Sequence, residues 1–127
     1  MAEKQYKTIK EFWPYYLGEH ADTTNRTFHF VGSAVALVWL GLALVLLNPW
    51  YLLAALVSGY AFAWVGHFFI EKNRPATFTY PLMSFACDWI MFGYILTGQI
   101  NKEIERLKKE GLWHPEEAAA PTKDVAA

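Results

Sequence analysis

The sequence predicts an all-α integral membrane protein, a helical bundle built around a central hairpin of two apolar helices. Two apolar stretches, residues 31–47 and 50–70, each approach the roughly 20 residues that cross the hydrocarbon of a bilayer. Between them, Asn48 and Pro49 favour a tight turn. The chain is rich in apolar side chains, with 54% hydrophobic and 17% aromatic residues. Its length of 127 residues fits a single domain, which we expect over residues 1–112.

A short helix is expected before the hairpin. Thr8 followed by Glu11 is the pattern of a capping box and predicts a helix through Leu17, with Gly18 at its end. Pro14 should kink this helix or mark its first turn. Four aromatic residues lie in it, and amphipathic rings are enriched at the level of lipid headgroups, so the helix is expected to be interfacial.

A third helix is expected after the hairpin. The apolar stretch over residues 81–98 contains Asp88, which makes it partly polar, and it passes into a charged helix over residues 101–111. The sequence leaves open whether this third stretch crosses the bilayer fully. Residues 113–127 have no apolar periodicity and are expected to form a disordered polar tail.

The composition argues against nucleic-acid binding and against a disulfide-stabilised fold. A net charge of −1 provides no basic stripe to neutralise phosphates, so nucleic acid is not an expected partner. Cys87 is the one cysteine, so the chain can form no intrachain disulfide and gives no sign of an oxidising compartment.

Basic residues predict the orientation of the hairpin. They flank both outer ends of the two apolar stretches and are absent from the turn between them: Lys4, Lys7, Lys10 and Arg26 come before, and Lys72 and Arg74 come after. The positive-inside rule then places the turn outside and the outer ends in the cytoplasm, in a bacterial inner membrane or an endoplasmic-reticulum-like membrane.

Three histidines are expected to converge at the cytoplasmic end of the hairpin. His20 and His29 flank the start of the first helix, and His67 ends the second, so a hairpin returns all three to one level. Glu71 lies one helical turn beyond His67 and would share its face. Ionisable groups beside hydrocarbon are functional by default, and this set predicts a metal site.

Two segments carry a resemblance to a known family. HADTTNRTFH and GHFFIEKNRPA resemble the two signature blocks of the fungal 2-hydroxy-fatty-acid dioxygenases, a family formerly called a domain of unknown function. The resemblance covers roughly residues 12–88. Ala21 stands where fungal members carry a second histidine, and those members are longer. The matching positions are His20, Asn25 and His29 in the first block and Gly66, His67, Glu71, Lys72, Arg74, Pro75 and Ala76 in the second.

The resemblance implies an enzyme of lipid α-oxidation. Such an enzyme uses Fe²⁺ and O₂ to remove one carbon from a long-chain 2-hydroxy fatty acid. The expected metal ligands are His20, His29, His67 and Glu71, and the expected catalytic residues are Asn25 and Arg74. Imidazoles and a carboxylate with open coordination positions suit oxygen activation at non-haem iron, and a guanidinium suits a substrate carboxylate.

Other functions stay open. A small membrane haem b protein could use His29 and His67 as axial ligands, but that leaves His20 unexplained. A hydrolase or desaturase-like metal enzyme is a further alternative, although desaturases use many more histidines than the four present. A non-catalytic membrane protein is another, in which Glu71 would only pair with Lys72 or Arg74 at the interface. The sequence does not define an oligomeric state.

Overall fold

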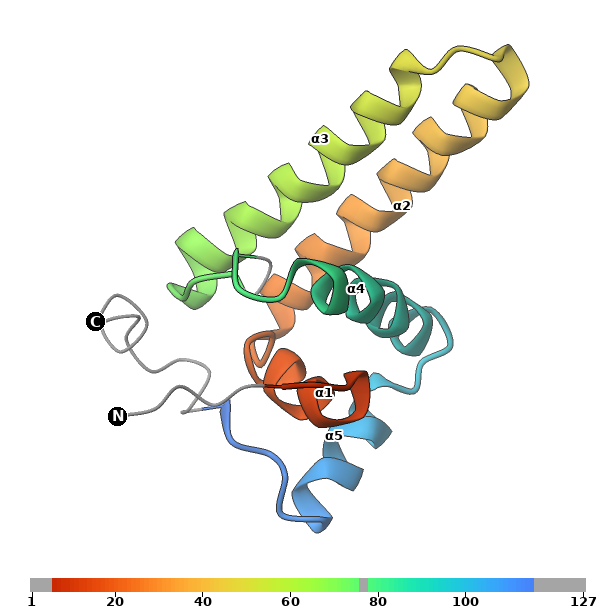
Figure 1. Cartoon of the computed structure of the whole chain (residues 1–127). Helices are drawn as coiled ribbons and strands as arrows, with labels where there is room; N and C mark the ends of the chain where they lie inside the picture. The colour runs from red at the N-terminus through yellow and green to blue at the C-terminus, as the bar shows by residue number, and fades with distance from the viewer. Residues whose placement is uncertain (1–5, 76–77, 116–127) are drawn as a thin grey trace.

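The computed structural model describes residues 6–75 and 78–115, and within them every regular element is a helix, as predicted. Figure 1 shows two long helices running side by side as a projecting hairpin, with the remaining helices gathered at its base. We call α2, α3 and η1 the arm, and α1, α4 and α5 the body. The elements are α1 (Ile9–Gly18), α2 (Thr23–Leu46), α3 (Trp50–Val65), the π-helical turn η1 (Gly66–Glu71), α4 (Pro81–Leu96) and α5 (Ile100–Lys109).

The arm consists of two helices that are long and apolar enough to cross a membrane. Thr23–Leu46 has 24 residues and a mean hydropathy of 2.1, and Trp50–Glu71 has 22 residues and a mean hydropathy of 1.6. At a rise of about 1.5 Å per residue, each is about 33–36 Å long. The predicted turn joins them, and the Asn48 side chain accepts a hydrogen bond from the Trp50 N–H at 3.0 Å.

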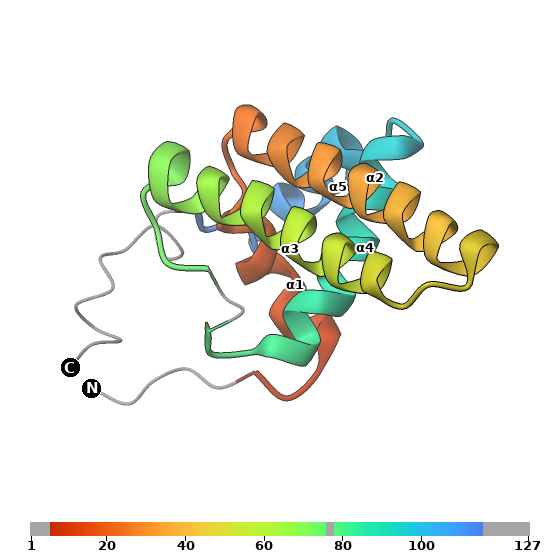
Figure 2. The ribbon, with the colours of Figure 1, turned by 90° about the horizontal axis from the view of Figure 1, so that it is seen from above.

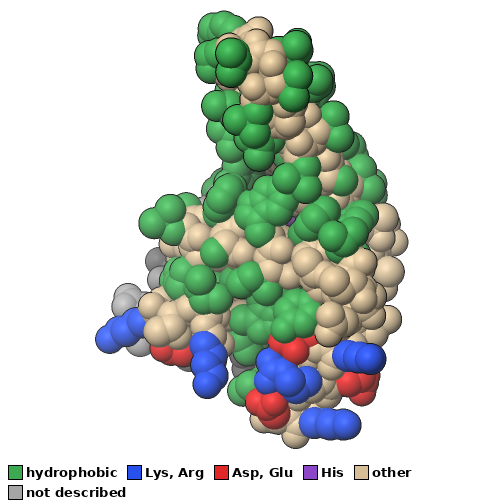
Figure 3. Space-filling view, turned by 90° about the vertical axis from the view of Figure 1, so that its right-hand side faces the viewer, with side chains coloured by type: hydrophobic (Ala, Val, Ile, Leu, Met, Phe, Trp, Pro, Cys, Tyr) green, Lys and Arg blue, Asp and Glu red, His purple; other side chains and the backbone are tan. Residues whose placement is uncertain are grey.

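The outer surface of the arm is apolar and uncovered. Leu44, Val45 and Leu47 are 68%, 79% and 86% exposed, and Figure 3 shows hydrophobic side chains over the projecting part of the molecule, with charged side chains at the opposite end. An apolar surface of this extent marks a site of contact with a membrane or with another protein. Length, composition and exposure therefore agree with the predicted hairpin.

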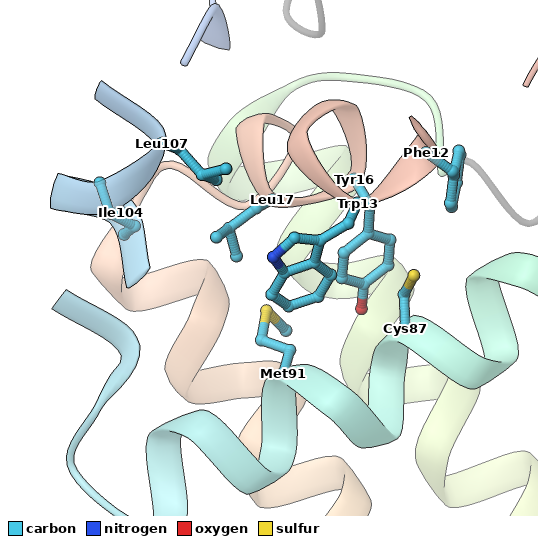
Figure 4. Packing of buried hydrophobic residues seen from close by; sticks show 8 residues of the cluster. All are labelled: Phe12, Trp13, Tyr16, Leu17, Cys87, Met91, Ile104 and Leu107. Atoms are coloured by element: carbon cyan, nitrogen blue, oxygen red, sulfur yellow. The ribbon is translucent and has the colours of Figure 1, made fainter. Parts of the chain in front are cut away.

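The body has a conventional hydrophobic core, in which one face of α1 packs against α4 and α5 (Figure 4). The aromatic rings of α1 were expected at the headgroup level, but Phe12, Trp13 and Tyr16 are buried. The reason is that α5 is strongly amphipathic and presents Ile104 and Leu107 to α1. The buried set is Phe12, Trp13, Tyr16, Leu17, Cys87, Met91, Ile104 and Leu107.

Polar contacts fix the start of α1 and tie the helix to α5. The Thr8 hydroxyl accepts a hydrogen bond from the Glu11 N–H at 3.2 Å, which confirms the predicted cap. Pro14 lies inside the helix rather than at its start. The Trp13 indole donates to the Glu103 carboxylate at 2.7 Å and thereby ties α1 to α5.

Helix α4 lies across the base of the arm and contacts both α1 and α2 (Figures 1 and 2). It has 16 residues, fewer than a membrane-spanning helix needs. The charged α5 is a separate helix, because Gly98 adopts a positive φ of 71° between the two. The predicted polar tail lies outside the described residues from position 116 onward, and Ala76 of the second signature block also lies outside them.

Candidate metal centre

The structure brings together the three histidines that were predicted to converge. His20 lies in the link between α1 and α2, His29 on the second turn of α2, and His67 in η1. Their ring centroids are separated by 4.2, 4.5 and 5.0 Å. One ligand atom from each histidine lies within 4.8 Å of the other two, and all three side chains are buried. This spacing fits a single metal ion.

Two of the histidines are oriented by oxygen acceptors at Nδ1. His20 Nδ1 lies 2.7 Å from the Tyr16 carbonyl, and His67 Nδ1 lies 2.7 Å from Asn73 Oδ1. The Asn73 amide nitrogen is already donating to the Glu19 carbonyl at 3.1 Å, which assigns the oxygen to His67. Each Nδ1 therefore carries the proton and donates, and each Nε2 presents a lone pair. Ligating histidines are oriented in this way in metal sites.

His29, on α2, is the third histidine of the group. Its Nδ1 faces the Asp88 carboxylate at 3.9 Å, and that carboxylate accepts a hydrogen bond from the Tyr16 hydroxyl. Its Nε2 lies 3.1 Å from His20 Nε2. Two Nε2 lone pairs at this distance repel each other unless a proton or a cation lies between them. The donor set therefore fits a metal ion that prefers nitrogen ligands.

The electrostatics of the site favour neutral imidazoles. Burial lowers the pKa of His20 well below its ordinary value of 6.5, and the neighbouring His29 and His67 lower it further. Burial also raises the pKa of the Asp88 carboxyl to about 7. Metal ligation requires the neutral imidazole, so the buried environment already holds His20 in the ligating form.

A small cavity lies against the cluster. Its volume is about 10 Å³, and His29, His67, Ser84 and Asp88 are among its lining residues. That volume is enough for about one water-sized species. The Ser84 hydroxyl is buried and has no hydrogen-bond partner among the described residues. A small ligand bound beside the histidines could therefore reach this hydroxyl.

A close approach between η1 and α2 positions His67. A Cβ atom at Gly66 would lie 1.8 Å from the Asn25 Oδ1 atom, so a glycine is required there. Lys72 then adopts a left-handed conformation with φ of 57°, and the Asn73 N–H returns to the His67 carbonyl at 3.0 Å. Asn25 itself is fully buried between the two segments rather than among the three histidine rings.

Glu71, predicted as the fourth ligand, is not part of the histidine group. Its carboxylate accepts a hydrogen bond from the Asp22 N–H at 2.5 Å, at the start of α2. His67 and Glu71 lie in one π-helical turn. The hydrogen bond from the Asp22 N–H directs the Glu71 carboxylate to the start of α2 instead of to the histidines.

Arg74 also lies apart from the histidines. Its guanidinium carbon is 5.3 Å from the centre of the Phe78 ring. The neighbouring residue Pro75 does line the small cavity, so the segment that carries Arg74 borders the site.

Two positioning residues were missed at the sequence level. Arg26 donates to the His20 and Ala21 carbonyls at 2.8 and 2.9 Å and so holds the link that carries His20. Asn73 orients His67. The sequence predicts Arg26 only as one of the basic residues that orient the hairpin, and it predicts no role for Asn73 in the site. Arg26 lies inside the first signature block and Asn73 inside the second. That location was the one sequence feature that could have indicated a role in the site.

Together, the fold and the cluster define an all-α protein with a candidate three-histidine metal centre at the base of an apolar hairpin. Residues 6–100 match the family described as 2-hydroxy-palmitic acid dioxygenase Mpo1-like. The chain belongs to this Mpo1-like family, which confirms the resemblance noted in the two signature blocks. No curated protein and no solved structure matches the chain.

Proposed function

We propose that this protein is an iron(II)-dependent membrane dioxygenase that shortens long-chain 2-hydroxy fatty acids by one carbon. The observation that carries the proposal is the convergence of His20, His29 and His67, with oxygen acceptors facing their Nδ1 atoms. Membership of a family described as a 2-hydroxy-palmitic acid dioxygenase supplies the substrate class.

The three histidines would hold the iron and leave coordination positions free, as oxygen-activating non-haem sites require. When bound, the iron supplies the capacity to activate O₂ and to chelate the hydroxyl and carboxylate of the substrate. The net reaction consumes one 2-hydroxy acid and one O₂ and gives the acid one carbon shorter, CO₂ and water. Carbon, hydrogen and oxygen balance without another reductant.

The surrounding residues prepare the site for this chemistry. The Tyr16 carbonyl and Asn73 orient the rings of His20 and His67, and the Asp88 carboxylate lies 3.9 Å from His29 Nδ1. Burial of the three histidines, each less than 7% exposed, limits the access of water. Ser84 offers a hydroxyl to a small molecule in the adjoining cavity, and Asp88 can hold a proton near His29.

The other predicted site residues keep narrower proposed roles. Arg74 borders the cavity through Pro75, and we propose that it binds the substrate carboxylate. Glu71 could become a fourth ligand only if it released the Asp22 N–H, so we propose it as an exchangeable ligand. Asn25 is proposed to act through its packing against Gly66.

We propose that the arm is inserted in the membrane, where a long-chain substrate would partition. Two helices of sufficient length and apolarity and an uncovered apolar surface support this. Basic residues around the base of the arm support a cytoplasmic location for the metal centre.

The geometry disfavours the haem alternative. His20 lies with its ring centroid 4.2 Å from that of His29 and 4.5 Å from that of His67. It therefore occupies the space that a macrocycle between two axial histidines would need, and the adjoining cavity of about 10 Å³ cannot hold one.

The proposal is tested by turnover of purified, iron-loaded protein in detergent or nanodiscs. We expect 2-hydroxypalmitic acid to be converted to the acid one carbon shorter with uptake of one O₂ per molecule. Palmitic acid should react poorly, because it lacks the hydroxyl needed for chelation. His67→Ala should abolish the reaction, and His114→Ala should leave it unchanged. Iron-loaded protein that consumes no oxygen with the 2-hydroxy acid would contradict the proposal.

A further inference from the structure

A second, larger cavity begins at the candidate metal centre. It has a volume of about 300 Å³ and lies between α2, α3 and α4. His29, Tyr60, Ala63 and Asp88 line both this cavity and the small one, so the two cavities adjoin at these side chains. Beyond these residues the lining is apolar except for Ser33.

The cavity follows the axis of the arm. On α2 the lining residues recur every three or four positions from His29 to Leu40, and on the antiparallel α3 they run from Ala63 back to Leu52. One face of each helix therefore lines it. Since His29 and Leu40 are eleven positions apart, the cavity extends about 16 Å from the histidines toward the hairpin turn. Phe85 and Trp89 of α4 lie along its side.

We propose that this cavity is an acyl-chain channel, which holds the alkyl chain of a single-chain 2-hydroxy acid while the polar head meets the histidines. The assignment rests on the proposed function for the identity of the head group. The cavity is apolar, is open along the arm where Leu37, Leu52 and Leu56 are 41%, 44% and 53% exposed, and has its polar groups near one end. This arrangement matches an amphiphile with one chain and one head. Ligand pockets are commonly apolar with a few polar groups that fix orientation.

Small residues keep the channel open. Ala36, Ala55 and Gly59 line it, and a Cβ at Gly59 would lie 3.9 Å from the Ala36 Cβ, in ordinary van der Waals contact. A large side chain at this level would fill part of the space between α2, α3 and α4. Gly59 lies nearer to the histidines than Ala55, which is closer to the turn. The two positions should limit the length of the bound chain at different depths.

The channel is tested by comparing kcat/KM for a long-chain and a short-chain 2-hydroxy acid. Ala55→Phe should lower kcat/KM for 2-hydroxyhexadecanoic acid by at least about tenfold, because several methylenes lose their burial. The kcat/KM for 2-hydroxyoctanoic acid should stay nearly unchanged. Ala61→Phe makes the same change on the exposed side of α3 and should alter kcat/KM for neither acid. Equal effects of Ala55→Phe and Ala61→Phe on the two acids would overturn the proposal.

A binding measurement separates the channel from the chemistry. A 2-hydroxyhexadecanoic acid with a diazirine at its terminal carbon is photolysed with the metal-free protein in nanodiscs. We expect cross-links near Leu40 and Leu52, lost in Ala55→Phe and kept in Ala61→Phe. Such a result without turnover would uphold the channel and contradict the proposed function. Labelling that reaches residues outside the cavity, such as Leu44 and Val45, as strongly as Leu40 and Leu52 would overturn the channel, whatever the turnover.

Discussion

The arm and the body use their hydrophobic residues in opposite ways. In the arm, Leu44 and Val45 are 68% and 79% exposed, whereas in the body Phe12 and Leu107 are fully buried. The body is therefore stabilised by packing within the chain, and the arm has an apolar surface that a lipid environment or a partner would cover. The same principle, removal of apolar area from water, acts on both regions through different surroundings.

The candidate metal centre lies where these two regions meet. His29 and His67 belong to the arm, and His20 follows α1 of the body. The residues around them are divided as well: Tyr16 and Asp88 come from the body, and Asn73 is the second residue after the arm. Desolvation of the histidines thus requires the body to be seated on the base of the arm, and a bound metal would fasten the two together.

The largest difference between the regions should appear in core substitutions. Leu107→Ala removes a fully buried side chain and should lower the free energy of unfolding by about 2–5 kcal/mol. Leu44→Ala, at an exposed position of the arm, should change it by no more than about 0.5 kcal/mol in micelles. Denaturant unfolding in one detergent measures both. Similar losses in the two variants would remove the distinction between arm and body.

A smaller effect is expected where η1 approaches α2. Gly66→Ala forces a Cβ onto Asn25 and should cost about 1–3 kcal/mol through overpacking, together with loss of metal affinity as His67 shifts. Gly93→Ala meets nothing within 4 Å and should be neutral or slightly stabilising.

The double variant Gly66→Ala/Asn25→Ala isolates this contact. Without the Asn25 amide, the nearest remaining atom is the Asn25 Cα at 3.6 Å, an ordinary contact. The double variant should therefore recover part of the stability lost in Gly66→Ala. If the losses of stability in Gly66→Ala and Asn25→Ala simply add in the double variant, the close approach does not cause the loss in Gly66→Ala.

The smallest effect concerns pH in the body. Hydrogen bonds from Arg106, and also from Trp13, hold the pKa of the Glu103 carboxyl below its ordinary value of 4.5. A lowered pKa in the folded state stabilises the protein above the unfolded-state pKa, and this contribution is lost as pH falls from about 4.5 through the lower folded-state value. We expect Glu103 to contribute about 1 kcal/mol to the free energy of unfolding at neutral pH.

Comparison of wild type with Glu103→Gln measures this contribution. The wild type should be more stable at pH 7, and the difference should shrink below pH 4.5, where Glu103 becomes protonated. Glu110→Gln, which breaks an ion pair whose two side chains are each 49% exposed, serves as the matched control and should have little effect at either pH. A constant difference between wild type and Glu103→Gln across this range would be inconsistent with the assignment.

The features that the sequence predicted depend on local pattern or on hairpin geometry. Apolar runs and Asn48-Pro49 indicated the arm, and Thr8 with Glu11 indicated the start of α1. The convergence of His20, His29 and His67 follows from antiparallel helices, because the ends of a hairpin meet at one level.

The features that the sequence did not predict depend on contacts between distant segments. Burial of Trp13 requires α5, which lies 90 positions away at Glu103. The Glu71 carboxylate is bound by the Asp22 N–H, 49 positions away, and a local period of 3.6 residues gives no sign of that contact. The role of Asn73 requires a left-handed Lys72 that turns the chain back to His67.

We propose that the Nε2 atoms of His20, His29 and His67 hold one metal ion between the arm and the body. The most direct measurement is the iron content and Fe²⁺ affinity of anaerobically purified protein, compared with His20→Ala, His29→Ala and His67→Ala. We expect about one iron per chain in the wild type and in His114→Ala. Loss of an orienting partner typically costs about 10–100-fold in affinity, so loss of any of the three ligands should cost at least as much. Full iron content with unchanged affinity in all three variants would contradict the account.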